Sequence, residues 1–161
     1  MRKTYLAIVR GVVAREHTTL TRAIGRHPTE RKRMSVVSHA PRAAVSQVTT
    51  LARFTGTARE DGAATLVRVQ PETGRTHQIR VHLASMGHPC LGDHLYGRGT
   101  DNVTPSFRRQ ALHALALSIL HPRSGERLDF VAPLPEDFKQ FFSARGLPVT
   151  SETLRGWIDS K

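Results

Sequence analysis

The stretch PETGRTHQIRVHLASMGHP at residues 71–89 is the most informative part of this chain, and it continues as LGD at 91–93 and LYG at 95–97. It predicts the end of a strand, then a turn, then an amphipathic helix. Gly74 supplies the permissive backbone of the turn, and Thr76 has the side chain of a helix N-cap. The stretch therefore predicts a strand–turn–helix unit.

The helix should bury one face and carry a charge at its edge. Ile79, Leu83 and Met86 recur at i, i+4 and i+7, which gives one buried stripe. Gly87 predicts the end of the helix. Arg80 lies next to the stripe, and an unpaired buried charge is costly. We therefore expect the Arg80 guanidinium to bind an acid or a polyanion.

Outside this stretch, β-forming residues dominate. Strands are expected at about 4–12, 20–24, 35–37, 44–54, 64–69, 111–120 and 128–131, and a second helix at 135–145. Short turns join most of the strands, which predicts an α+β fold with a mixed, mainly antiparallel sheet and a few helices. No repeat or low-complexity linker interrupts the sequence, so residues 1–161 are expected to form a single domain.

The charge balance points to a polyanionic partner. Lys and Arg total 24 against 13 acidic residues, which gives a net charge of +11 and a pI near 11.3. A chain this basic commonly binds nucleic acid, and arginine suits phosphate contacts and stacking on bases. A solubilising basic surface or a membrane-surface patch remains the alternative.

The remaining composition limits the compartment and the chemistry. The single cysteine, Cys90, excludes an internal disulfide and fits a reducing compartment. The apolar run at 5–9 ends at Arg10, too short for a signal peptide, so a cytoplasmic protein is expected. His77, His82, His88 and Cys90 lack the spacing of a metal site, and no GxSxG, Walker A or GxGxxG motif occurs.

Three segments carry a resemblance to a known family. GRTHQIRVHLA at 74–84, followed by GHPCLGDHLYG at 87–97, resembles motif III of the RluA-type pseudouridine synthases, which isomerise uridine in RNA. KTYLAIV at 3–9 matches the family's motif II. GRHPTERKRM at 25–34 resembles the relatives nearest to RluC and RluD. The resemblance implies a bent catalytic-domain sheet, no cofactor, no metal, and RNA as partner, most specifically 23S ribosomal RNA.

The resemblance also assigns roles to two residues. Members of the family use one aspartate during glycosidic cleavage and an arginine that holds it ionised, and the matching arginine is Arg80. Tyr5 matches the motif II tyrosine, whose ring can stack on the target uracil. The ordinary alternatives are a helix-surface arginine and a strand tyrosine packed on the core.

A further set of polar residues is expected to bind RNA. Free N–H groups at a helix start attract phosphate, and the loop at 25–34 is strongly basic. The expected RNA-binding residues are Arg75, Thr76, His77, Gln78, Arg26, Arg31, Lys32 and Arg33. A polar helix cap and a solvated basic loop are the competing interpretations.

One element of the family pattern is missing. The nucleophilic aspartate belongs to an HRLD segment that precedes motif II, and this sequence contains no HRLD. The S4-like RNA-binding domain of many relatives is missing too. The chain is therefore expected to be a partial catalytic domain, inactive by itself, with its first strand at an unpaired sheet edge. The alternative is a non-catalytic RNA-binding module descended from such an enzyme.

Overall fold

A computed structural model describes residues 1–30, 32–38, 40–55, 62–97 and 104–159 of the chain. Its centre is a six-stranded antiparallel sheet in the order β2-β5-β6-β1-β7-β8. The strands are β1 Arg2–Arg10, β2 His17–Leu20, β5 Ser46–Phe54, β6 Ala64–Pro71, β7 Leu112–Leu120 and β8 Arg127–Val131. A two-stranded ribbon of β3 Gly25–Arg26 and β4 Met34–Ser35 lies beside it. The expected α+β class with a mainly antiparallel sheet is confirmed.

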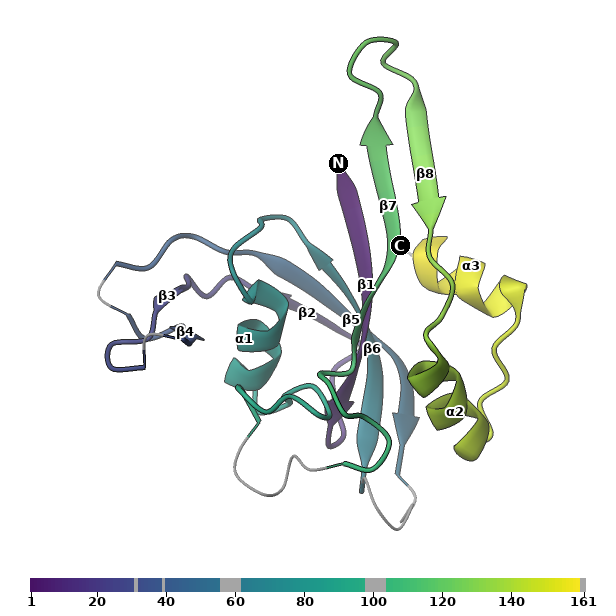
Figure 1. Cartoon of the computed structure of the whole chain (residues 1–161), viewed down its shortest axis with the longest axis horizontal. Helices are drawn as coiled ribbons and strands as arrows, with labels where there is room; N and C mark the ends of the chain where they lie inside the picture. The colour runs from purple at the N-terminus through teal and green to yellow at the C-terminus, as the bar shows by residue number, and fades with distance from the viewer. Residues whose placement is uncertain (31, 39, 56–61, 98–103, 160–161) are drawn as a thin grey trace.

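Helices cover both faces of the sheet (Figure 1). They are α1 Gln78–Ser85, α2 Glu136–Ala144 and α3 Ser151–Asp159. Leu6 and Ile8 of β1 pack in the core that contains the phenylalanines of α2. Ala7 and Val9 pack instead with α1. Because successive strand residues point to opposite faces, Tyr5 lies on the α1 face, where it packs against that second core.

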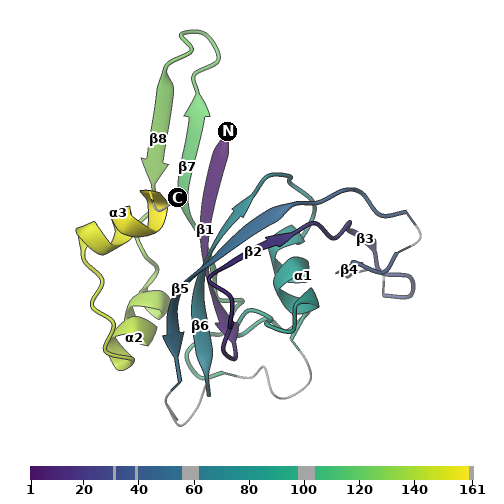
Figure 2. The same ribbon diagram turned by 180° about the vertical axis from the view of Figure 1, so that it is seen from behind.

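The far end of the sheet extends away from these layers. The β7–β8 hairpin projects beyond the other strands in both ribbon views (Figure 2). Its outer strand carries exposed Phe130 and Val131, and Leu120 is exposed at its tip. Within the described residues, no helix is long and apolar enough to cross a membrane.

The expectation that the first strand lies at an unpaired edge is wrong. Tyr5 lies opposite Val69 of β6 on one side and Ala114 of β7 on the other. The strand β1 is therefore central, and its backbone groups are satisfied by both neighbours. The edge strands are β2 and β8.

Two local expectations also need correction. The strand expected at 20–24 forms earlier, as β2, and Ile24 makes only an isolated bridge to Arg42. Helix α3 was not expected, although its sequence carries a start signal. The Thr150 hydroxyl accepts a hydrogen bond from the Thr153 amide, 3.2 Å, which is a side-chain cap of the first turn.

Candidate active site

The turn between β6 and α1 is held by a buried glutamine. Gln78 Oε1 accepts hydrogen bonds from the Arg75 amide, 2.9 Å, and the Thr73 hydroxyl, 2.8 Å. Its Nε2 donates to Val45 O and Ser46 Oγ, at 2.9 and 3.0 Å. The amide is thus fully used within the protein, which argues against the expected RNA contact of Gln78.

The start of α1 differs from the expected cap. The N-cap is His77, whose φ of 54° is left-handed, and it makes no side-chain cap bond. Thr76 is therefore not the N-cap, and Gly74 does not supply the left-handed residue of this turn. A non-glycine residue in this region is strained, so the surrounding contacts must hold His77 there. Gly87 ends the helix in the left-handed conformation, as expected.

Behind the turn lies a neutral histidine. His82 is fully buried, with its Nε2 2.8 Å from Arg22 O and its Nδ1 3.0 Å from Ser46 Oγ. A carbonyl oxygen only accepts, so Nε2 carries the proton and Nδ1 accepts from Ser46. Burial and the Arg22 charge lower the pKa of His82, despite the bond to the Arg22 carbonyl.

The free energy of unfolding should therefore fall as the solution becomes more acidic. The unfolded histidine binds a proton near about pH 6.5, whereas the folded pKa of His82 lies lower. The contribution of His82 to the free energy of unfolding is complete above the unfolded pKa. It is lost as the pH falls from there toward the folded pKa. Urea unfolding between pH 7.5 and 5 should show this loss.

A His82→Gln variant supplies the control for this pH effect, because it lacks the titrating group. Its free energy of unfolding should depend less on pH than that of the parent. Some slope should remain, because burial also lowers the pKa of His77 and His113. Equal slopes in the parent and the variant would contradict this role of His82.

The acid that Arg80 binds is Asp93. Arg80 Nε lies 2.7 Å from Asp93 Oδ2 and Nη2 lies 2.7 Å from Oδ1, which makes a bidentate ion pair. The Asp93 side chain has no exposed surface and that of Arg80 is 14 % exposed. The helix pattern required an acid or a polyanion for Arg80. It did not single out Asp93, because Asp93 lies 13 residues further along the chain.

The loop around Asp93 stabilises its charge. The Leu95 and Tyr96 amides each donate to Oδ1, at 3.0 Å. Burial alone would raise the pKa of Asp93, but the bonds from Arg80 and these two amides outweigh it, so the pKa lies below its usual range. The hydrogen bond with Asp93 likewise raises the pKa of Arg80. Both partners of the pair are therefore charged.

Tyr96 connects this ion pair to the basic loop and to the turn. The Arg80 guanidinium lies over its ring, 4.9 Å from Cζ to the centroid. Its Oη accepts from the Met34 amide at 2.9 Å and lies 2.9 Å from His77 Nδ1. Whether Oη donates to Nδ1 or accepts from it depends on the tautomer of the His77 ring. Burial, and then the Arg80 charge, lower the pKa of His77, which favours the neutral ring.

A thiol lies directly behind the same loop. Cys90 is fully buried and its backbone bridges Val9 of β1. Burial raises the pKa of this thiol to about 12. Among the described residues, no three His, Cys, Asp or Glu side chains gather into a possible metal site.

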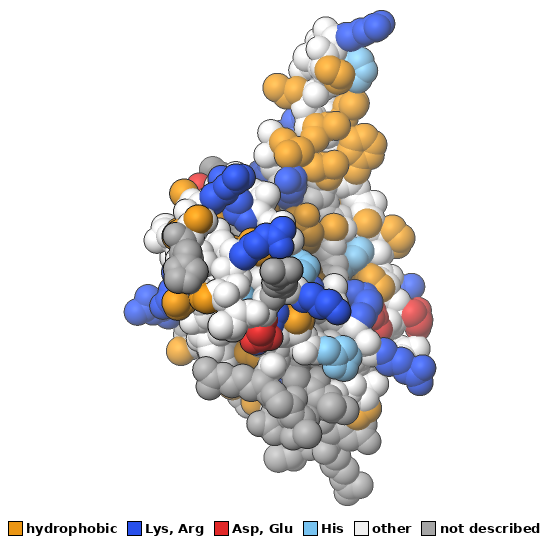
Figure 3. Space-filling model, turned by 60° about the vertical axis from the view of Figure 1, so that its left-hand side comes forward, with side chains coloured by type: hydrophobic (Ala, Val, Ile, Leu, Met, Phe, Trp, Pro, Cys, Tyr) orange, Lys and Arg blue, Asp and Glu red, His pale blue; other side chains and the backbone are white. Residues whose placement is uncertain are grey.

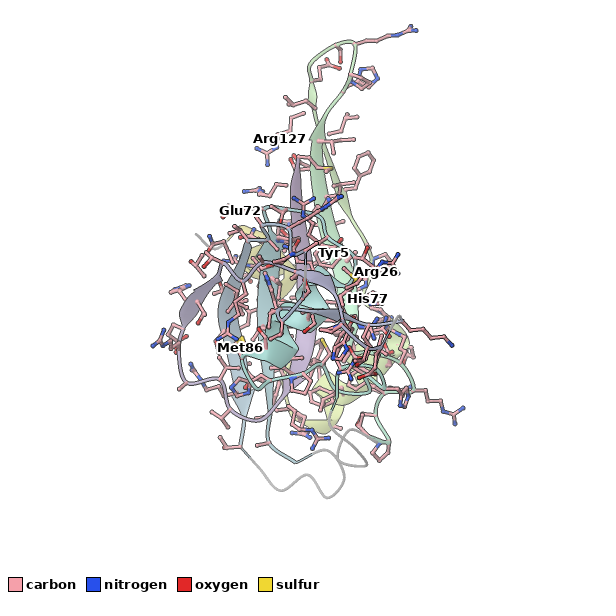
Figure 4. The ribbon with its side chains drawn as sticks, turned by 90° about the vertical axis from the view of Figure 1, so that its left-hand side faces the viewer. Tyr5, Arg26, Glu72, His77, Met86 and Arg127 are labelled. Carbon is pink, nitrogen blue, oxygen red and sulfur yellow. The ribbon has the colours of Figure 1, made fainter. Side chains whose placement is uncertain are left out.

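A pocket of about 320 Å³ opens where β1 meets the turn and α1. Tyr5 enters it from β1 and Arg80 from α1, with His77 at the turn; Figure 4 shows Tyr5 and His77 on the same side of the ribbon. The pocket also contains Lys3 and Gln110, neither of which was expected in the site. Among the residues that the structure describes, no Asp or Glu lines this pocket, so it favours an anionic or polar ligand.

A second, larger cavity of about 720 Å³ adjoins the first at Gly74 and Arg75. Arg26, Arg42 and Arg75 line it, and Arg75 Nε also donates to Ala43 O at 3.1 Å. Lys and Arg side chains gather on this face of the molecule (Figure 3). This second cavity is termed the basic groove.

The other expected RNA-binding residues are distributed around the basic groove. Thr76 lines the basic groove. Lys32, in the loop at 25–34, is exposed. Arg33 is partly engaged, with an ion pair to Glu30 at 2.7 Å and a contact over the Tyr96 ring. Arg31 lies outside the described residues. Arg26, Arg75 and Thr76 thus line the same groove, whereas Arg33 also contacts Glu30 and Tyr96.

Comparisons with known proteins show the family of this chain. The sequence model of the family described as RNA pseudouridylate synthase matches residues 1–85, just over half of the chain. The chain belongs to the RNA pseudouridylate synthase family. The matched region includes β1 with Tyr5 and α1 with Arg80.

Individual relatives support the family assignment. The chain is 41 % identical to ribosomal large subunit pseudouridine synthase D of Nitrosomonas europaea, over 94 % of this chain and 43 % of that protein. An uncharacterized RNA pseudouridine synthase of Bacillus subtilis, YlyB, is 42 % identical, over 86 % of this chain and 42 % of its own length. The chain thus spans less than half the length of these curated pseudouridine synthases.

A solved structure shows the same arrangement. Human RNA pseudouridylate synthase domain containing 1 superposes with a TM-score of 0.75 at 27 % identity, over 99 % of this chain and 66 % of that one. The fold described above is therefore shared by pseudouridylate synthase domains.

Proposed function

We propose that this chain forms part of the catalytic domain of an RNA pseudouridine synthase, an enzyme that converts uridine to pseudouridine in large-subunit ribosomal RNA. The observation that carries this proposal is that Tyr5 and Arg80, far apart in the sequence, line one pocket on one face of the sheet. The names of the relatives support the reaction and the RNA class. The cytoplasm is the proposed compartment.

The reaction breaks the bond between C1′ of ribose and N1 of uracil and forms a bond between C1′ and C5. A carboxylate attacks C1′ and the base leaves with the electrons of the C1′–N1 bond. The base then rotates, and its C5 displaces the carboxylate from C1′. The proton on C5 then departs and N1 gains one, so the product is an isomer of the substrate. The target base must leave its stack to enter the pocket. No cofactor or metal is required.

Asp93 does not fit the role of the attacking carboxylate. Its side chain has no exposed surface, and Arg80 and two backbone amides bind its oxygens. We propose instead that an HRLD segment, which the printed sequence lacks, supplies the nucleophile beside Arg80. Tyr5 then stacks on the uracil and takes part in the later proton removal from C5.

The basic groove gives the RNA strand a path to the pocket. It adjoins the pocket at Arg75, and Arg26 and Arg42 line it further along. None of the described residues that line this groove is acidic. We propose that phosphates flanking the target uridine bind there.

A Tyr5→Phe substitution tests the role of the phenol. The Tyr5 hydroxyl makes no hydrogen bond to any described residue, so its removal should leave the fold and RNA binding unchanged. In an active form of the protein, turnover should fall by about 10²-fold or more, the range for a lost proton-transfer group. Single-turnover pseudouridine formation on a large-subunit RNA fragment measures this, and full activity of the variant would remove Tyr5 from the chemistry.

The second candidate function is a non-catalytic RNA-binding module. One observation favours it: Asp93 already neutralises Arg80, so the fold does not need a nucleophile for charge balance. Reading the genomic DNA ahead of codon 1 separates the two proposals, because an in-frame HRLD favours the enzyme. Mapping pseudouridine in ribosomal RNA, with and without the gene, then tests the reaction directly. Loss of one modified site on deletion supports the enzyme, and an unchanged map supports the module.

A further inference from the structure

The Arg80 guanidinium has one edge occupied and one edge open. Asp93 binds the side-on edge, formed by Nε and Nη2. Nη1 makes no hydrogen bond to any described residue, and Arg80 lines the pocket. A guanidinium has five donors in a planar fork, so the end-on edge of Nη1 and the second N–H of Nη2 remains available for a second bidentate ligand.

The orientation of this open edge is fixed by its surroundings. The Asp93 carboxylate is itself held by the Leu95 and Tyr96 amides, so it cannot follow Arg80 if that side chain moves. The Tyr96 ring lies against the guanidinium at 4.9 Å. A partner on one edge and a ring on one face leave the guanidinium little rotational freedom.

We propose that Asp93 is a positioning residue that presents the end-on edge of Arg80 to a second carboxylate in the pocket. This inference rests on the proposed function, in which the second carboxylate is the nucleophile. A single arginine then binds two carboxylates with different roles. The buried one orients the guanidinium, and the one in the pocket attacks the substrate. Lys3 and Arg75 line the same pocket and add positive charge, which favours binding of the second anion.

The first experiment does not depend on catalysis. Sodium acetate, as a carboxylate probe, is titrated into the chain while the side-chain ¹⁵N–¹H signals of Arg80 are followed by NMR. The Nη signals should shift saturably and the Nε–H signal, held by Asp93, should not. If acetate leaves all Arg80 signals unchanged, or shifts Nε–H as much as the Nη signals, the proposal is overturned.

A phosphate titration distinguishes the two possible anions. Inorganic phosphate at the same ionic strength should shift the Nη signals no more strongly than acetate. If phosphate binds this edge about tenfold more tightly, a difference of about 1.4 kcal/mol, the open edge is an RNA phosphate contact and the proposal fails.

The Asp93→Asn variant tests the positioning role. An amide cannot accept at both atoms, so acetate affinity at Arg80 should fall by about tenfold, a difference of about 1.4 kcal/mol. Asp137→Asn, which alters the ion-pair partner of Arg109 and a carboxylate more exposed than Asp93, is the matched control and should leave acetate binding unchanged. Unaltered binding in Asp93→Asn overturns the proposal. If Asp93→Asn does not fold, the parent titrations with acetate and phosphate still decide whether the end-on edge of Arg80 binds a carboxylate while Asp93 holds Nε–H.

In an active form of the protein, the same variant should show a split in its kinetic constants. Arg80 acts on the nucleophile and not on RNA, so Asp93→Asn should lower kcat and leave KM for RNA unchanged. A change confined to KM overturns the positioning role. If acetate binds as expected but no form of the protein makes pseudouridine, the proposed reaction fails and the two-carboxylate geometry stands.

Discussion

Replacing Arg80 with alanine should lower the free energy of unfolding by about 3–5 kcal/mol, the cost of breaking a buried ion pair by removing one partner. The substitution leaves the Asp93 carboxylate without its bidentate donor in a place with no exposed surface. Two backbone amides still bind Asp93, but they do not replace a full positive charge. Chemical denaturation monitored by circular dichroism measures the loss.

A matched control separates this effect from the removal of any salt bridge. Lys139 and Glu136 form an exposed pair on α2, 3.6 Å apart. Lys139→Ala should change the free energy of unfolding by less than about 1 kcal/mol, as exposed pairs do. Similar small losses in both variants would show that the Arg80–Asp93 pair is unimportant for stability.

RNA affinity should fall steeply as salt is added. Each phosphate neutralised on a single strand contributes a slope of about −0.7 in log affinity against log salt. The basic groove presents Arg26, Arg42 and Arg75. If these three each bind one phosphate, affinity should fall by roughly 10²-fold for a tenfold rise in salt. Fluorescence anisotropy with a labelled single-stranded RNA from 50 to 500 mM salt, a range of about tenfold, measures the slope.

Two arginines offer a graded test of the groove. Arg26→Ala should reduce the steepness by about 0.7, one contact's worth. Arg33→Ala should reduce it less, because Arg33 is already paired with Glu30. A flat salt response in the parent would contradict RNA binding as the reason for the net charge of +11.

Local sequence patterns predicted the elements well. The spacing of Ile79 and Leu83 predicted a buried helix face, and both are buried in α1. Gly87 marked the end of that helix, and most strands formed within a few residues of their expected limits. These features depend on contacts between residues close in the chain, which is why the sequence alone reveals them.

The misplaced expectations depend on long-range contacts. The central position of β1 results from pairing with β7, which follows more than a hundred residues later. The partner of Arg80 lies across a loop, so the pattern indicated that an acid or a polyanion was needed but not that Asp93 was the partner. The hydrogen bonds from Gln78 to Val45 and Ser46 also join residues distant in sequence, so the local pattern does not reveal them.

The buried cysteine offers a natural reporter of motion in this site. Cys90 lies just before Asp93 and bridges the central strand at Val9, so the two are exposed together when this loop detaches. A thiol with a pKa of about 12 and no access to solvent reacts only in such open states. The rate at which a thiol reagent labels Cys90 in the native chain therefore reports how readily the loop that contains Asp93, the partner of Arg80, opens.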